Sequence, residues 1–304
     1  MDEELKKIEN QLREISHGHV ESSQLYPGIE LCFFATKTEL ASIKHPPLPH
    51  IMEINYCRAG RLGWKMGNGN QIYLGPGDFS LHTLDACADS TLCFPTEQYE
   101  GLTLCVDFHE LSANPPELLA GTGINGKRFK EKYWRDSVFA SFAGSAQTDA
   151  IFSAFYGQPE NLKLAYQKIK SIELLLYLSK METGPRGRLT EYQSEQVEIV
   201  RKIHEHLTTH MDERITIEAL SQQYLINPTT LKAAFKSVYG NSIAAHIKEH
   251  RMEQAAKLLW ETDLSMAEIG LKIGYESQSK FTSAFKSYYQ MLPTEYRKKR
   301  PSPK

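Results

Sequence analysis

The chain has 304 residues, of which 41% are hydrophobic and 24% are charged, a composition typical of a globular protein with two domains. It contains no run of about 18 apolar residues, so we expect no membrane-spanning helix and no membrane partner. The acidic start, Met1 to Glu4, leads into no apolar stretch, so we expect no secretory signal peptide and a cytoplasmic location.

Charge and cysteine are both distributed unevenly. Residues 196–304 hold 16 Lys and Arg against 12 Asp and Glu, whereas residues 1–195 hold 19 against 25. This asymmetry is typical of a basic nucleic-acid-binding module joined to an acidic domain. The five cysteines fall in the first 105 residues, are odd in number and match no zinc spacing, so we expect free thiols, with redox sensing as the less favoured alternative.

A short amphipathic helix is predicted at residues 1–16. Leu5, Ile8, Leu12 and Ile15 are spaced by 3, 4 and 3 residues, which places them on one helical face. Two heptads are too short for an independent coiled coil. The helix must therefore dock, either on its own domain or on a second copy of the chain.

Residues 20–110 are predicted to form many short strands. Turn-rich sequences such as Gly67-Asn68-Gly69-Asn70 separate them, and this pattern is typical of a barrel or jelly roll. The predicted strands are 28–35, 50–58, 62–66, 71–74, 79–83, 91–94 and 101–107.

The order Glu53, Gly60 and then Gly75-Pro76-Gly77-Asp78 resembles the two half-motifs of cupin barrels. A metal-binding cupin would carry a His-x-His pair before Glu53 and a histidine three residues after Gly77, where this chain has Ser80. We therefore expect no metal, no cofactor and no catalytic residue. A metal-dependent cupin enzyme fused to a DNA-binding module remains the least favoured alternative.

A barrel without a metal can still bind a small molecule through a few polar and aromatic side chains. Such residues would suit a sugar or another small organic effector. The candidate effector-binding residues are His50, Glu53, Asn55, Tyr56, Trp64, Tyr73, His82 and Tyr99.

Residues 161–181 form the strongest predicted helix of the chain. Leu162, Ala165, Ile169, Ile172 and Leu176 make one apolar stripe, which Leu175 and Leu178 widen. This apolar surface exceeds one packing face, so we expect one side to cover the barrel and the other to pair with a second copy, with burial inside one subunit as the alternative. The turn-rich segment 183–195 is expected to link a domain of residues 1–182 to one of residues 196–304.

The C-terminal part contains a duplicated unit, because Ala234-Phe235-Lys236-Ser237 returns as Ala284-Phe285-Lys286-Ser287. Each copy ends a short helix that follows another helix and a tight turn, the layout of a helix-turn-helix. In the first copy, Thr216 and Asn227 are predicted N-caps, and Pro228 begins the second helix. Its predicted buried stripe is Leu231, Ala234, Phe235 and Val238.

In the second copy, Ser265 and Ser277 are the predicted N-caps, and a turn is expected at Gly274. The predicted buried stripe of its second helix is Phe281, Ala284, Phe285 and Tyr288. A long apolar helix over 242–260 connects the copies and would hold them at the spacing of successive major grooves, about 34 Å.

In each copy, the outward face of the second helix is polar and basic, with residue types that hydrogen-bond base edges and phosphates. A terminal basic run, Arg297 to Arg300, adds to this character. The candidate DNA-binding residues are Thr229, Thr230, Lys232, Lys236, Gln278, Ser279, Lys280, Thr282, Ser283 and Lys286.

These residues resemble the AraC-type (AraC/XylS) family of transcription regulators over about 100 residues. The resemblance rests on Leu220, Leu231, Phe235-Lys236, Gly240, Ser242, Arg251, Ala255, Leu258-Leu259, Ile269, Gly274-Tyr275, Ser277, Phe281, Phe285-Lys286, Pro293 and Tyr296-Arg297. It implies a seven-helix bipartite DNA-binding domain, with base-reading positions at Thr229, Lys232, Ala233, Gln278, Ser279 and Ser283.

Four positions depart from the family pattern or leave a choice open. Relatives often have Arg where Ala233 and Ser283 stand, so base reading is expected to shift to neighbours such as Lys232 and Thr282. Relatives usually have Gly where Gln290 stands, so the helix before it is expected to end differently. Arg251 is expected either to contact a phosphate or to pair with nearby acids.

We therefore predict a multidomain α+β protein: an N-terminal cupin-like β-barrel with dimerisation helices, and a C-terminal all-α domain with two helix-turn-helix motifs. The predicted function is sequence-specific regulation of transcription, with activation favoured by the resemblance. The expected partners are double-stranded promoter DNA, a small-molecule effector, RNA polymerase and a second copy of the chain. Control by a protein partner instead of a ligand is the main alternative.

Overall fold

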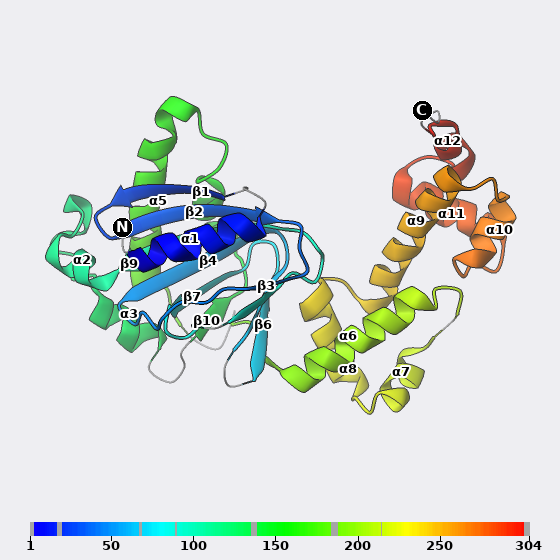
Figure 1. Ribbon diagram of the computed structural model, residues 1–304, viewed down its shortest axis with the longest axis horizontal. Helices are drawn as coiled ribbons and strands as arrows, with labels where there is room; N and C mark the ends of the chain where they lie inside the picture. Colours follow the sequence, from blue (N-terminus) through cyan, green and yellow to red (C-terminus); the bar gives the residue numbers. More distant parts are fainter. Residues whose placement is uncertain are drawn as a thin grey trace. The chain divides into compact units, whose positions relative to one another are not determined.

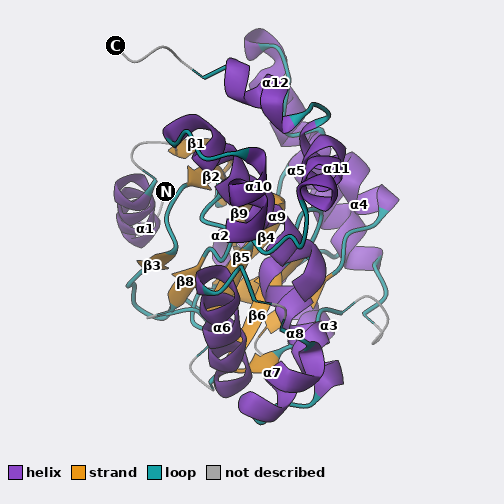
Figure 2. Ribbon diagram, turned by 90° about the vertical axis from the view of Figure 1, so that its right-hand side faces the viewer, coloured by secondary structure: helices purple, strands orange, loops and turns teal. Residues whose placement is uncertain are grey.

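The computed structural model describes residues 3–16, 20–66, 69–88, 90–134, 139–183, 188–213 and 215–300. The chain divides into two compact units, residues 1–194 and 195–304. Strands occur only in the first unit, whereas helices and loops make up the described part of the second (Figure 2). Gly67-Asn68 of one predicted turn and Gly184–Gly187 of the predicted linker lie outside the described residues.

Two antiparallel sheets form the first unit. The six-stranded sheet has the order β1 (Val20–Tyr26), β2 (Ile29–Thr36), β9 (Tyr99–Asp107), β4 (Ile51–Gly60), β7 (Phe79–Thr83), β10 (Phe139–Phe142). The five-stranded sheet has the order β11 (Tyr192–Gln193), β6 (Asn70–Leu74), β5 (Leu62–Lys65), β8 (Thr91–Cys93), β3 (Leu40–Ser42).

All seven predicted strands are present, as β2 and β4 to β9, but the sequence analysis missed β1, β3, β10 and β11. β10 is buried at each of its four residues and shows no alternation, so its period gives no sign of a strand. β11 lies inside the predicted linker, where Tyr192 pairs with Gln71 of β6. The second half of that linker is therefore part of the first unit's sheet.

Each face of the six-stranded sheet has its own cover. One face encloses a core shared with the other sheet, in which Phe34, Trp64, Ile72 and Phe94 are buried. The opposite face carries a second core beneath helices. Those helices are α2 (Phe108–Ala113), the short 3-10 helix η1 (Glu117–Leu119), α3 (Gly126–Tyr133), α4 (Ala146–Ser153) and α5 (Glu160–Lys180).

The N-terminal helix α1 (Glu3–Ile15) docks on its own domain. It lies across the six-stranded sheet on the side opposite α5 (Figure 1). Ile8, Leu12 and Ile15 pack against the core between the sheets. The Gln11 side chain donates to the Lys44 carbonyl and accepts from the Lys44 N–H, each at 2.9 Å. In this conformation, α1 therefore docks on its own domain, which is one of the two expected sites.

The described part of the second unit is helical. Its helices are α6 (Ser194–Thr209), α7 (Ile217–Gln223), α8 (Pro228–Tyr239), α9 (Ile243–Glu261), α10 (Met266–Lys272), α11 (Gln278–Tyr289) and α12 (Pro293–Lys298). The predicted organisation, a β-rich N-terminal domain with antiparallel sheets and a helical C-terminal domain with two helix-turn-helix units, is confirmed.

Among the described residues, no helix combines the length and the apolar character needed to cross a bilayer.

Candidate nucleic-acid interface and barrel cavity

The first helix-turn-helix unit begins and ends at the predicted caps. The Thr216 and Asn227 side chains accept the N–H groups of Ala219 and Thr229, which starts α7 and α8. The turn between the helices contains Leu225 at φ 52°, a left-handed conformation unusual for leucine, and 92% of that residue is exposed.

The second unit repeats this arrangement with different residues. Ser265 and Glu268 cap α10 reciprocally, as a capping box. Gly274 forms the turn at φ +82°, and the Ser277 side chain accepts the Lys280 N–H to begin α11. The two units therefore present α8 and α11 through the same capping chemistry.

The buried stripes are confirmed except at two positions of α11: Ala284 is half-buried at the edge of its core, and Tyr288 is exposed. Leu231, Ala234, Phe235 and Val238 of α8 are fully buried, as are Phe281 and Phe285 of α11. Tyr288, predicted to be buried, is 39% exposed, because its hydroxyl reaches Glu249 at the edge of α9. Tyr289 packs against Phe285 instead, with ring centroids 4.7 Å apart.

The candidate DNA-binding residues form two exposed faces. Thr230 and Thr282 are half-buried at the margins of these faces. The exposed members are Thr229, Lys232 and Lys236 on α8, and Gln278, Ser279, Lys280, Ser283 and Lys286 on α11. No acid lies within either helix, so both faces are positively charged and accessible to an anionic partner.

One of these lysines is already engaged. Lys280 Nζ forms an ion pair with Glu276, which lies two residues before the start of α11. Both side chains are about two-thirds exposed, so the pair adds little stability and can open. The sequence analysis missed Glu276, although an acid just before a helix N-terminus is readable from the sequence.

Arg251 has a structural role, one of the two expected for it, although its partners are backbone carbonyls rather than acids. Its guanidinium donates to the Met211 carbonyl through Nη2 at 2.6 Å and Nε at 3.0 Å, and to the Glu213 carbonyl at 3.2 Å. Gly274 lies directly against these contacts, here called the Arg251 clamp, because a Cβ there would be 2.3 Å from the Met211 oxygen. The loop after α6, helix α9 and the second turn therefore meet at one point.

Two further expectations about the C-terminal end are revised. Gln290 adopts φ 56° and ψ 21°, so α11 ends in the left-handed conformation that Gly240 gives α8, not in a different way. Within the basic run, Arg297 donates to the Leu264 carbonyl at 2.5 Å, and Arg300 pairs with Asp263. Arg297 therefore has a structural contact of its own.

In the first unit, strand register brings part of the predicted effector set together. Glu53 of β4 pairs directly with His82 of β7, and Glu53 Oε2 lies 2.8 Å from His82 Nε2. Burial raises the pKa of Glu53, but the interactions with His82, Asn55 and His45 together outweigh it and lower the pKa.

A small cavity of about 50 Å³ adjoins this pair. Glu53, Asn55, Trp64 and Tyr99 line it, and Ile8 and Leu12 of α1 close one side. A water occupies ~30 Å³ and drug-sized ligands need ~300 Å³ or more, so the cavity in this conformation does not fit a sugar.

Some buried polar atoms around this cavity have no partner among the described residues. They are Asn55 Nδ2, Ser80 Oγ and His82 Nδ1. The Asn55 oxygen does have a partner, because Thr103 Oγ1 donates to it at 2.6 Å. Unpaired buried polar atoms call for an ordered water or a ligand.

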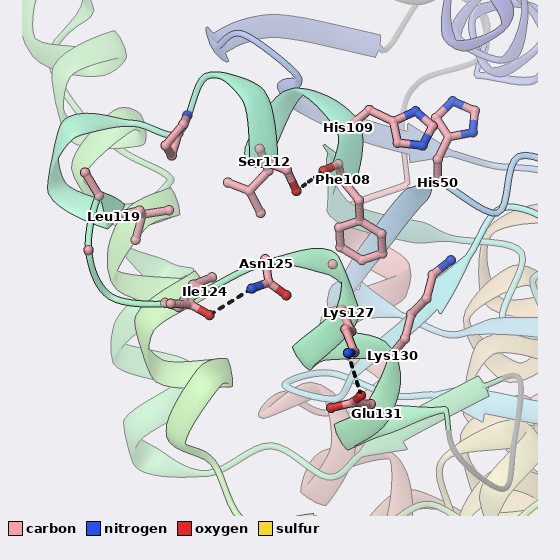
Figure 3. Close-up of a pocket in the computed structure, with 16 residues that line it drawn as sticks. His50, Phe108, His109, Ser112, Leu119, Ile124, Asn125, Lys127, Lys130 and Glu131 are labelled. Carbon is pink, nitrogen blue, oxygen red and sulfur yellow. Dashed lines mark hydrogen bonds and ion pairs between the residues drawn. The ribbon is translucent and has the colours of Figure 1, made fainter.

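Three predicted effector residues lie elsewhere. Tyr56 points to the opposite face of β4 and stacks on Phe152 with centroids 4.3 Å apart. The Tyr73 hydroxyl donates to Gln71, and its ring packs over Gly63, outside the cavity. His50 stacks on His109 at the edge of a separate open groove of about 850 Å³ between α2 and α3, which Lys127 and Lys130 also line (Figure 3).

Beside the cavity lies a group of potential metal ligands that was not predicted from the sequence. One ligand atom each of Glu53, His82 and Cys87 lies within 4.8 Å of the others. Cys87 Sγ is also 3.7 Å from His45 Nε2. Burial raises the pKa of the Cys87 thiol.

Helix α5 has one buried and one exposed apolar face. Ile172, Leu174, Leu175 and Leu178 are fully buried against the sheet. The exposed side carries Leu162, Leu164, Tyr166, Ile169 and Leu176, each between 38% and 57% exposed. Burial of the whole stripe within one subunit is therefore wrong.

Comparison with known proteins places this geometry in context. A family described as a helix-turn-helix domain matches residues 220–299. The HTH-type transcriptional regulator AlkR of Acinetobacter baylyi is 30% identical over 82 residues, 27% of each chain. The probable transcription factor PqrA of Proteus vulgaris is 30% identical over 101 residues, which cover 33% of this chain and 83% of PqrA.

A longer match extends into the β-rich domain. The arabinose operon regulatory protein of Escherichia coli is 26% identical over 178 residues, 54% of this chain and 60% of that protein. The match spans less than two thirds of the length of AlkR and of the arabinose regulator. Two capped helix-turn-helix units are joined by α9, and the match covers 83% of PqrA. The chain therefore belongs to the AraC/XylS family of transcriptional regulators.

Proposed function

We propose that the protein binds double-stranded DNA through α8 and α11 and regulates transcription. The observation that carries this proposal is the pair of exposed, acid-free helix faces. Each begins at a capped N-terminus, where backbone N–H groups favour phosphate. Helix α9 has 19 residues and so spans about 28 Å, close to the repeat of the major groove.

Two substitutions test this DNA interface. Lys232→Ala on α8 and Gln278→Ala on α11 remove one exposed candidate reader from each unit. We expect each to weaken specific binding by about 1–3 kcal/mol. Lys257→Ala, an exposed lysine of α9, is the matched control for loss of charge. Equal operator affinity in all three variants and the parent would show that other faces bind DNA.

Salt dependence separates phosphate contacts from base contacts. Neutralised phosphates release counterions, so affinity should fall steeply as salt rises. Lys232→Ala should reduce that slope if its ammonium contacts a phosphate, whereas Gln278→Ala should leave the slope unchanged and relax base preference.

We further propose that the cavity beside Glu53 and His82 is the effector site. Glu53 and the unpaired Asn55 Nδ2 supply polar contacts in the cavity lining, and Trp64 supplies an aromatic wall. Because the cavity is small and α1 closes it, an effector larger than a few atoms must displace α1. This requirement makes the position of α1 a reporter of ligand binding.

The effector proposal is tested by a thermal-shift screen with sugars, fatty acids and small metabolites, followed by variants. Asn55→Ala should abolish the shift that a true ligand causes. Lys130→Ala, in the separate groove of Figure 3, should leave it unchanged. The reverse result would move the effector to the groove, and no shift with any compound would favour control by a protein partner.

We propose that the exposed face of α5 forms a homodimer. Ile169→Glu introduces a charge at a residue that is 57% exposed, and Leu118→Glu does the same at an unrelated leucine that is 67% exposed. Analytical ultracentrifugation should show a weaker dimer only for Ile169→Glu. Equal sedimentation of both variants and the parent would remove α5 from the interface.

The remaining parts of the proposal concern the transcriptional outcome. We propose activation through RNA polymerase at a promoter in the cytoplasm, as the family resemblance favours. A promoter fusion with and without the protein tests this directly, because reduced transcription on addition of the protein would indicate repression. The alternative of a metal-dependent enzyme in the barrel would require that the purified protein contain stoichiometric metal and that Glu53→Gln remove it.

A further inference from the structure

Three histidines converge inside the first half of the DNA-binding domain. His204 comes from α6, and His246 and His250 come from one face of α9, four residues apart. The Nε2 atoms of His246 and His250 are 3.0 Å apart. One ring nitrogen of each of the three residues lies within 4.8 Å of the other two.

The three rings lie largely inside the folded domain rather than in solvent. His246 is 7% exposed, and the other two rings are half-buried. Tyr239, the last residue of α8, stacks on His204 with ring centroids 4.3 Å apart and an interplanar angle of 16°. The rings of His204 and His246 are 5.0 Å apart, and those of His204 and His250 are 5.4 Å apart.

Burial lowers the pKa of two of the three imidazoles. Burial and the nearby His250 lower the pKa of His204 to about 4. Burial, His250 and His204 lower the pKa of His246 to about 3. His250 Nδ1 also lies 3.7 Å from a Glu253 carboxylate oxygen, the kind of outer partner that orients metal-bound histidines.

We propose that His204, His246 and His250 bind a divalent first-row transition-metal ion, most simply Zn²⁺. Imidazole nitrogens bind such ions at about 2.0–2.1 Å, so two of them on a tetrahedral ion lie ~3.3 Å apart. The 3.0 Å separation already present across α9 is close to that value, and three imidazoles are a known zinc ligand set with a fourth position open.

The other donor clusters of the described residues fit an ion less well. In the cluster of His50, Asp107 and His109, the two rings are stacked with an interplanar angle of 4°, and the carboxylate already caps α2. In the barrel cluster, Glu53 already pairs with His82 at 2.8 Å. Among the described residues, the cluster of α6 and α9 is the one that offers three histidine nitrogens.

An ion at this site would join α6 to α9. These helices meet through the ring contacts of His204 with His246 and His250, and Arg251 of α9 holds the loop after α6. The ion would bind the folded domain and not the unfolded chain, so it would stabilise the domain by mass action.

The test uses the full-length protein, freed of metal with a chelator and titrated with Co²⁺ as a spectroscopic probe. We expect one equivalent to bind with a visible ligand-field band, and Zn²⁺ to displace it. His250→Gln and His204→Gln, each at a half-buried position, should weaken binding at least tenfold. His206→Gln/His210→Gln is the matched control, because both residues are also half-buried and four residues apart, His206 on α6 and His210 directly after its end.

A second readout guards against variants that fail to fold. Zn²⁺ should raise the melting temperature of the parent and the control by several degrees, but not that of His250→Gln, whose circular dichroism without metal should match the parent. The proposal is overturned if Co²⁺ does not bind, if His250→Gln binds as tightly as the parent, or if an intense near-ultraviolet band assigns the ion to a thiolate.

Discussion

Gly274→Ala tests whether the two helix-turn-helix units are joined through the Arg251 clamp. At φ +82°, a side chain at this position is strained in any case. Its Cβ would also lie 2.3 Å from the Met211 carbonyl oxygen and 2.7 Å from Arg251 Nη2. The carbonyl is backbone, so relief requires the second turn to move away from the loop that precedes α7.

The expected cost follows from two contributions. The left-handed conformation costs about 1 kcal/mol for alanine. Displacing the guanidinium weakens charge-assisted hydrogen bonds to Met211 and Glu213, each worth about 1.5–3 kcal/mol. Because some of these bonds can re-form after a small shift, we expect a total loss of about 2–4 kcal/mol.

Native-state hydrogen exchange followed by mass spectrometry measures this loss, because peptides report residues 195–304 separately from residues 1–194. Gly157→Ala is the matched control: it has φ +70° with nothing within 4 Å of a new Cβ, so only the conformational cost of about 1 kcal/mol applies. We also expect Gly274→Ala to reduce affinity for a two-site operator more than for a single site. Equal stability losses at Gly274 and Gly157 would refute the clamp.

Three further substitutions probe other parts of the molecule. Glu276→Gln should raise DNA affinity severalfold in a fluorescence anisotropy titration, because it removes an anion beside α11 and releases Lys280 from its ion pair. Unchanged affinity would place α11 away from the phosphates. Gln290→Gly should stabilise the domain by about 0.5–1 kcal/mol in denaturant unfolding, because glycine adopts the left-handed conformation without strain. A loss of stability would mean that the hydrogen bond from the Gln290 side chain to the Ser287 carbonyl outweighs the strain. Gln11→Ala should speed amide exchange of residues 3–15 about tenfold by removing both bonds to Lys44, whereas unaltered exchange would show that the apolar face alone holds α1.

Local signals in the sequence were sufficient for the C-terminal domain. N-cap residues, a proline at the first helical position and a repeated apolar stripe identify α7, α8, α10 and α11. Each of these features acts within one or two helical turns, so it is readable without the fold. One exception, the exposed Tyr288, depends on a contact with Glu249 of α9, 39 residues away.

The barrel shows which rules of a sheet are readable and which are not. Strand alternation alone would separate Tyr56 from Glu53 and Asn55, and Tyr73 from Ile72 and Leu74, because successive side chains point to opposite faces. The pairing of Glu53 with His82 depends on register between β4 and β7, which motif spacing does not reveal. The partners of Arg251 are backbone carbonyls about 40 residues earlier, and a carbonyl has no sequence signature.

Helix α9 is the element on which both functional arguments about the C-terminal domain depend. Its buried residues Met252, Ala255 and Leu259 belong to the core of the second helix-turn-helix unit, while Ile243 and His246 contribute to the first. Arg251, between these two sets, holds the loop after α6. A helix fixed at both ends and near its middle transmits displacement rather than absorbing it, because packed interiors resist deformation. An ion on His246 and His250 would therefore act on the same element that sets the spacing of α8 and α11.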